Sequence, residues 1–128
     1  MKISVLGLCG NSVFLNVDHF HVPGETVHAR GLYAEPGGKG YNQAVAAARM
    51  GAQVTFAGAI GRDSDGEICT QRLLGEGIAP RMCVKEARTA YAAILTDAGG
   101  ENRVTVFPGA QMTAKDVSAA EDSFAQAD

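Results

Sequence analysis

The sequence predicts an α/β fold built around a parallel β-sheet. Two apolar runs, 3–8 and 54–60, have the length and the content of β-branched residues that are typical of buried strands. An alanine-rich segment from 41 or 42 to 50 predicts a helix that ends at Gly51, and a second helix is expected from 64 to about 74. Strands and helices that alternate at these lengths indicate parallel strands connected by helices.

Helix starts are indicated by two capping boxes. Ser64 and Glu67 have the spacing at which each side chain can bond the other's backbone N–H group. Thr113 and Asp116 have the same spacing and precede an amphipathic pattern over 117–124. Both patterns predict the first turn of a helix.

Two β-rich segments interrupt the α/β pattern. The first holds candidate strands near 12–20 and 26–34, separated by a turn at 23–24. The second is a predicted hairpin of 89–96 and 103–107. No linker separates these segments from the rest, so we expect them to form one sheet that is inserted twice. A further strand is expected over 81–85.

The composition argues against several classes of protein. The chain has 128 residues, the length of one domain, and 11 Lys and Arg against 14 Asp and Glu give a net charge of −3. This acidic balance argues against nucleic-acid binding. No segment approaches the roughly 18 consecutive apolar residues of a membrane span, and no signal peptide is found. We expect a cytoplasmic protein that binds neither nucleic acid nor membranes.

No metal site is predicted. The three cysteines are odd in number and lack a C-x-x-C pair, which argues against a disulfide framework and a zinc site. His19 and His21 would share one face of a strand, but no further ligand has suitable spacing, so we interpret them as part of a solvated surface. Asp63 and Asp65 are interpreted as structural, because negative charge is favourable at a helix start.

A glycine cluster precedes the alanine-rich helix. Gly37, Gly38 and Gly40 would let the backbone approach a ligand closely and leave N–H groups free for a phosphate or for sugar hydroxyls. A tight turn into a packed helix explains the same pattern. A phosphate-binding Walker A loop is excluded because Lys39 is followed by glycine rather than by Ser or Thr, and the G-x-G-x-x-G dinucleotide motif is incomplete after the first strand.

The segment over 37–52, GGKGYNQAVAAARMGA, resembles the first signature of the PfkB, or ribokinase-like, carbohydrate kinase family. Three further pieces follow the family's order: PGET at 23–26, GRDSDG at 61–66 and FPGA at 107–110. The resemblance covers essentially the whole chain. It implies a ribokinase-like fold, with a doubly wound, mostly parallel sheet and a small inserted β lid, which is incomplete in this chain.

The resemblance also implies a division of the chain. It places the N-terminal part of a ribokinase-like domain over 1–128, and the lid would often form a homodimer contact. The core is expected over about 1–11, 36–80 and 109–128, and the β lid over about 12–35 and 86–108.

The function implied by the resemblance is ATP-dependent phosphorylation of a sugar or nucleoside hydroxyl. ATP and Mg²⁺ are the implied cofactors, although most of the residues that bind them are absent from this chain. The family's catalytic base lies in a D-T-x-G-A-G-D-like motif that does not occur here, so no catalytic residue is named. The alternative is a non-catalytic sugar-binding or dimerisation module on the same fold.

The substrate-binding residues are carried over by position. Family members hold the sugar with the glycine motif, which points to Gly38, Lys39, Gly40 and Asn42. Asn42 is the strongest single candidate, because its amide donates and accepts hydrogen bonds at once. The N-x-D motif that ribokinases carry after the first strand is replaced here. Gly10 and Ser12 stand at its two ends, and Asn11 and Ser12 are the polar side chains available for a hydroxyl.

Overall fold

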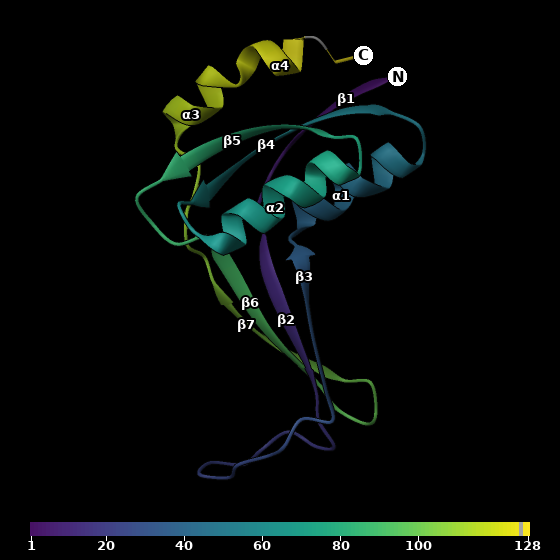
Figure 1. The fold of residues 1–128 in the computed structure, drawn as a ribbon, viewed down its shortest axis with the longest axis vertical. Coiled ribbons are helices and arrows are strands. Elements are labelled where there is room, and N and C mark those ends of the chain that lie inside the picture. Colours follow the sequence, from purple (N-terminus) through teal and green to yellow (C-terminus); the bar gives the residue numbers. More distant parts are fainter. Residues whose placement is uncertain (126) are drawn as a thin grey trace.

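The computed structural model describes residues 1–125 and 127–128. Two separate sheets and two pairs of helices make up the fold (Figure 1). In chain order the elements are β1 (Lys2–Leu6), β2 (Gly10–Asn16), β3 (Gly31–Gly37), α1 (Lys39–Arg49), β4 (Gln53–Gly61), α2 (Ser64–Gly75), β5 (Ala79–Lys85), β6 (Ala90–Thr96), β7 (Asn102–Phe107), α3 (Ala114–Ala119) and α4 (Glu121–Ala125).

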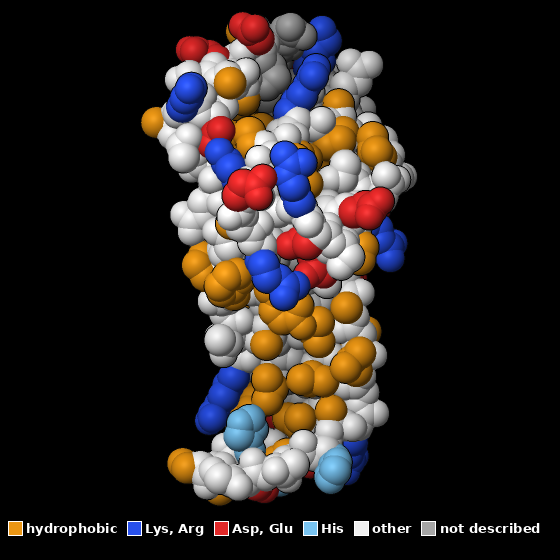
Figure 2. Space-filling model, turned by 60° about the vertical axis from the view of Figure 1, so that its left-hand side comes forward, with side chains coloured by type: hydrophobic (Ala, Val, Ile, Leu, Met, Phe, Trp, Pro, Cys, Tyr) orange, Lys and Arg blue, Asp and Glu red, His pale blue; other side chains and the backbone are white. Residues whose placement is uncertain are grey.

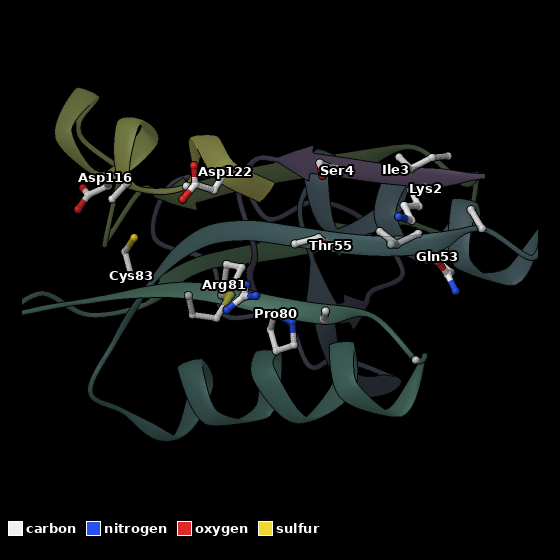
Figure 3. A pocket seen from close by; sticks show the side chains of 17 residues that line it. Lys2, Ile3, Ser4, Gln53, Thr55, Pro80, Arg81, Cys83, Asp116 and Asp122 are labelled. Atoms are coloured by element: carbon white, nitrogen blue, oxygen red, sulfur yellow. The ribbon is translucent and has the colours of Figure 1, made fainter. Parts of the chain in front are cut away.

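The first sheet is parallel and has the order β1-β4-β5. Helices α1 and α2 cover one face of it, and α3 and α4 lie on the other side (Figures 1 and 3). This is the predicted α/β architecture with helices on both sides of a parallel sheet. It confirms the strands expected from the apolar runs at 3–8 and 54–60.

The core lies between this sheet and helices α1 and α2. Phe56 of β4 and Leu73 of α2 are fully buried there, and Ala44 lets α1 approach the sheet closely. Burying a side chain of the size of Phe or Leu stabilises the fold by about 1.5–3 kcal/mol. This packing fixes the position of α1, and therefore of its N-terminus, relative to the end of β1.

The second sheet has the order β3-β2-β6-β7 and extends away from the first (Figure 1). Its outer pairs are antiparallel hairpins, and β2 and β6 join them by parallel pairing from Gly10↔Ala90 to Asn16↔Thr96. The two β-rich segments therefore form one sheet, as predicted. Strands β2 and β6 start, and β3 and β7 end, next to the helical part of the molecule (Figure 1).

The limits of the first hairpin differ from the prediction. The strands expected near 12–20 and 26–34 are β2 at Gly10–Asn16 and β3 at Gly31–Gly37. The reason is the length of the neighbouring strand: β6 ends at Thr96, so β2 has no parallel partner beyond its last pair with that residue. The turn at 23–24 is present, within a longer loop.

The helices also show differences from the predicted limits. Helix α1 begins at Lys39, two or three residues before the expected start. The amphipathic segment over 117–124 is two short helices, because the N–H of Ala120 closes the last turn of α3 on Asp116 and Val117. The capping box of Thr113 and Asp116 is present. No helix formed by the described residues is long and apolar enough to cross a membrane.

Candidate functional site

The end of β1 and the start of α1 touch through glycines. A Cβ atom added to Gly40 would lie 2.7 Å from the Cα of Gly7, and one added to Gly7 would lie 2.8 Å from the Cα of Gly40. Neither backbone can move away easily, because one belongs to the sheet end and the other to a helix. The N–H of Tyr41 donates to the carbonyl oxygen of Leu8 at 3.3 Å across the same contact. The first turn of α1 is thus held against the β1–β2 turn.

Gly38 is the N-cap of α1 and has a backbone conformation that favours glycine. Its φ is +113°, and a Cβ there would lie 2.4 Å from the carbonyl oxygen of Leu8. A glycine N-cap has no side chain with which to bond the helix N–H groups. Within the described residues, no acceptor is found for the N–H groups of Lys39 and Gly40. The positive end of the helix dipole and two backbone N–H groups without a protein acceptor therefore lie at the start of α1.

A small cavity of about 110 Å³ adjoins this turn. It lies at the end of the four-stranded sheet, where β2 and β6 start and β3 and β7 end. Pockets that enclose a small molecule usually measure about 300–1,000 Å³, so this cavity is too small to enclose one by itself. Its lining residues are Leu8, Gly10, Asn11, Ser12, Gly37, Gly38, Ala90, Tyr91, Ala92 and Val106.

Three of the six predicted substrate-binding residues line this cavity: Gly38, Asn11 and Ser12. The other three lie along the first turn of α1 and outside the lining. Gly40 is buried against the β1–β2 turn, whereas the side chains of Lys39 and Asn42 are exposed. The structure brings the six residues to one corner of the fold.

Ser12 is more buried than its neighbour Asn11 on β2. It is 8% exposed, and a Cβ added to Gly37 of the paired strand would lie 2.8 Å from its Oγ atom. The strand turns Asn11 and Ser12 to opposite faces of the sheet. Both reach the cavity because it lies at the end of the sheet.

Asn11 has a partner that the sequence did not indicate. Its Nδ2 atom donates to Oδ1 of Asp65 at 2.8 Å, and the side chain of Asp65 is only 13% exposed. The other carboxylate oxygen, Oδ2, lies 3.4 Å from Nη2 of Arg88. Residues 11 and 65 are far apart in the sequence, and no spacing rule relates them. Asp65 was expected to be structural, and it bonds a candidate site residue.

Asp63 joins the two sheets and corrects one prediction. It is the N-cap of α2, and its Oδ1 accepts a hydrogen bond from the N–H of Gly66 at 2.9 Å. The capping box predicted for Ser64 and Glu67 is therefore wrong, because the cap lies one residue earlier. Asp63 also accepts hydrogen bonds from the hydroxyl and the N–H of Thr89, at 2.6 and 2.8 Å.

This arrangement lowers the pKa of Asp63. Partial burial acts to raise the pKa, but the hydrogen bonds from Thr89 and Gly66 stabilise the carboxylate and outweigh burial. Thr89 is 1% exposed, and its hydroxyl oxygen also accepts from the N–H of Gly61 at 2.9 Å. The end of β4, the start of α2 and the approach to β6 are thereby linked, which positions β6 beside the cavity.

None of the described cysteines and histidines lines the small cavity. Cys9 and Cys69 are fully buried free thiols, and the neighbouring Cys69 thiol together with burial raises the pKa of Cys9. A raised thiol pKa makes the nucleophilic thiolate scarce. His19 bonds the carboxylate of Glu25 at 2.7 Å in the loop after β2. Among the described residues, no group of three or more His, Cys, Asp or Glu could hold a metal ion.

A larger cavity, about 910 Å³, lies elsewhere (Figure 3). It runs along the face of the three-stranded sheet beneath α3 and α4, with Arg81, Asp116 and Asp122 among its lining residues. Lys85 pairs with Asp116 beside it and lowers the pKa of that carboxyl group. In parallel α/β sheets, ligands bind beyond the carboxyl ends of the strands. The turn formed by Gly37, Gly38 and Gly40 at the start of α1, here called the glycine turn, is held at the carboxyl end of β1. The larger cavity is not at such an end, so we take the glycine turn as the candidate site.

Comparison with known proteins identifies the class to which this fold and this glycine turn belong. The model of the family described as pfkB family carbohydrate kinase matches residues 1–128, so the chain belongs to that family. It is 38% identical over 132 residues to a ribokinase of Staphylococcus aureus, and the match covers 99% of this chain and 43% of the relative. The chain thus spans less than half the length of this curated relative.

Two solved ribokinase structures show the same fold. The ribokinase of Giardia lamblia matches with a TM-score of 0.90 and 26% identity, over 98% of this chain and 42% of that protein. The ribokinase of Cryptococcus neoformans in complex with ADP matches with a TM-score of 0.76 and 38% identity, over 85% of this chain and 34% of that protein. The ribokinase-like fold expected from the sequence is confirmed.

Proposed function

We propose that this chain is the substrate-binding part of an ATP-dependent kinase that phosphorylates a hydroxyl group of a sugar or nucleoside. The observation that carries the proposal is the contact of Gly38 and Gly40 with the β1–β2 turn, which fixes the start of α1 where Gly38 lines the cavity. The family match and the ribokinase relatives support the same class of activity.

Four of the six candidate residues have a chemical role in this proposal. The N–H groups of Lys39 and Gly40 donate to hydroxyl oxygens of the sugar, and Ser12 offers a hydroxyl from the cavity wall. Asn42 approaches from the exposed side of α1, where its amide donates to one hydroxyl and accepts from another. Lys39 adds positive charge at the rim. These groups bind and orient the substrate; none of them is assigned the removal of the proton from the attacking hydroxyl.

The nucleotide is ATP with Mg²⁺, and this chain supplies little of their binding site. The relative from Cryptococcus neoformans, which was solved with ADP, supports adenine nucleotide use. The residues described here hold no cluster suited to a metal ion. We therefore assign the base, the nucleotide contacts and the Mg²⁺ ligands to the part of the longer relatives that this chain does not span. Phosphoryl transfer depends on placing the hydroxyl in line with the γ-phosphate, and the glycine turn provides that placement.

The four-stranded sheet acts as a lid and as a homodimer surface in this proposal. One row of side chains crosses all four strands on one face: Tyr33, Phe14, Ile94 and Val104. Phe14 and Tyr33 stack at 4.4 Å, and Tyr33 and Val104 are 49% and 52% exposed. Figure 2 shows hydrophobic side chains gathered over this sheet. An exposed apolar sheet face of this kind favours association with a second copy.

The test is sugar-dependent ADP formation by the full-length protein that contains this chain. We expect at least one neutral sugar or nucleoside of a broad panel to stimulate ADP release. For that substrate, Asn42→Ala should raise the KM or lower kcat by about tenfold, the effect of losing one good hydrogen bond. Gln43→Ala, an exposed neighbour in the same helical turn, is the matched control and should change neither constant.

A folded, full-length protein that releases no ADP with any member of the panel would contradict the kinase proposal and favour a non-catalytic sugar-binding or dimerisation module. Unchanged kinetics for Asn42→Ala would leave the kinase and remove Asn42 from its site.

A further inference from the structure

We propose that Asp65 is a positioning residue for the substrate site, acting through Asn11. The proposal starts from the chain of contacts Asn11–Asp65–Arg88, in which the carboxylate receives the amide on Oδ1, at 2.8 Å, and the guanidinium on Oδ2, at 3.4 Å. The Asp65 side chain is 13% exposed, whereas that of Arg88 is 72% exposed. This nearly buried acid thus reaches from the first turn of α2 to the strand that lines the cavity.

The contact sets the direction of the Asn11 amide. A carboxylate accepts hydrogen bonds and has none to donate, so the group of Asn11 that faces it must be the NH₂. Arg88 contacts the second oxygen, Oδ2, at 3.4 Å, so Oδ1 is the oxygen that faces the Asn11 amide. The carbonyl oxygen of Asn11, Oδ1, is then the group left for a ligand. Without Asp65 the amide could turn over and present two donors instead.

The consequence is a defined preference at the cavity wall. Asn11 lines the cavity together with Ser12. Ser12 stands where the N-x-D motif has its aspartate, so the charged acceptor of the motif is absent. An Asn11 held by Asp65 supplies a fixed neutral acceptor next to that position. The site therefore favours a hydroxyl group that donates a hydrogen bond to Asn11, as on a neutral sugar, and disfavours a carbonyl or ether oxygen at the same place. This inference rests on the proposed function.

The test is a double-mutant cycle in the full-length protein with the sugar that it phosphorylates. Asp65→Asn keeps the shape, but its one carbonyl oxygen is taken by Arg88 and its NH₂ group faces Asn11, so the Asn11 amide turns over. We expect this variant to raise the KM for the sugar by about tenfold with kcat and the KM for ATP unchanged. Asn11→Ala should raise the KM similarly. Added to Asn11→Ala, Asp65→Asn should have no further effect, because Asp65 acts through the amide that is already absent.

Two controls separate positioning from stability. Glu67→Gln removes an exposed carboxylate from the same turn of α2 and should leave the KM unchanged. A deoxy analogue that lacks the hydroxyl read by Asn11 should bind worse to the wild-type protein, and Asp65→Asn should lose this discrimination. If Asp65→Asn does not fold, Asp65→Ser is measured against the same expectations.

The inference is overturned if the Asp65 variant keeps the wild-type KM, or if it raises the KM by the same factor with and without Asn11. A wild-type protein that phosphorylates the sugar normally would then leave the proposed function standing. A wild-type protein that phosphorylates no sugar would overturn the proposed function, and this inference with it.

Discussion

At the scale of single residues, two glycines with positive φ have different reasons to be glycine. Gly38 combines a φ of +113° with a would-be Cβ only 2.4 Å from a backbone oxygen. Gly51, after the end of α1, has a φ of +90° and nothing within 4 Å of the corresponding position. At Gly51 a side chain would cost only the free energy of the positive-φ conformation, whereas at Gly38 it would also clash with Leu8.

Gly38→Ala should therefore destabilise the full-length protein by about 2–4 kcal/mol, since strain at positive φ and a clash with Leu8 add together. Gly51→Ala should cost only about 1 kcal/mol, the conformational part alone. Urea unfolding of both variants measures the difference. Equal losses would show that Gly38 is not in close contact with Leu8 and that the turn is looser than described.

At the scale of elements, Asp63 links the two sheets. Its carboxylate caps α2 and bonds both donors of the buried Thr89. Asp63→Ala should destabilise the protein by about 2–4 kcal/mol, the sum of a lost N-cap and of unpaired groups on a buried threonine. Glu67→Ala, an exposed acid in the same turn, should change stability by less than about 0.5 kcal/mol. Thermal or urea unfolding checks both values.

The pH dependence of folding stability follows from the lowered pKa of Asp63. A carboxyl group whose pKa is lower in the folded state stabilises the fold above its unfolded pKa, near 3.9, and this contribution is lost as the pH falls through the folded pKa. The stability difference between the wild-type protein and Asp63→Asn should therefore be constant near neutral pH and shrink below about pH 4. A difference that stays constant down to pH 2 would contradict the ionised, hydrogen-bonded carboxylate.

The exposed row on the four-stranded sheet yields a prediction about assembly. Val104→Arg places a charge in the apolar row and should convert the proposed homodimer of the full-length protein to monomer in analytical ultracentrifugation. Thr105→Arg introduces the same charge on the opposite face of β7 and is the matched control. A dimer that survives Val104→Arg and dissociates with Thr105→Arg would place the contact on the other face.

The sequence predicts an element well when the element depends on a local pattern, and poorly when it depends on contacts between distant residues. The strands at 3–8 and 54–60 and the hairpin of the second segment were predicted because their patterns are local. The end of β2 at Asn16 was not, because it depends on where β6 stops. The cap of α2 was placed one residue late because Ser64 and Asp63 are both good caps, and contact with Thr89 decides between them. Asp65 was not recognised as a partner of Asn11 for a similar reason, since only the fold brings them together.

At the scale of the whole molecule, the outer edges of β1 and β5 in the three-stranded sheet pair with no further strand among the described residues. The chain spans 43% of the ribokinase of Staphylococcus aureus, and the face of the three-stranded sheet beneath α3 and α4 holds the larger cavity. The backbone of Asp128 donates to the carbonyl oxygen of Lys2, beside the outer edge of β1. Sheet edges and faces left uncovered favour aggregation.

Residues 1–128 expressed alone should accordingly be poorly soluble or associate, whereas the full-length protein should not. Size-exclusion chromatography with light scattering measures this directly. A monodisperse monomer of residues 1–128 that melts cooperatively would contradict the expectation and favour a self-contained module.

The central claim is that the glycine turn binds the sugar, and hydrogen–deuterium exchange of the full-length protein with and without saturating sugar tests it most directly. The N–H groups of Lys39 and Gly40 have no acceptor among the described residues, so a bound sugar should slow their exchange, together with that of the segment 10–12. Protection confined to the residues around the larger cavity, at 79–83 and 116–122, or no protection at saturating sugar, would contradict the claim.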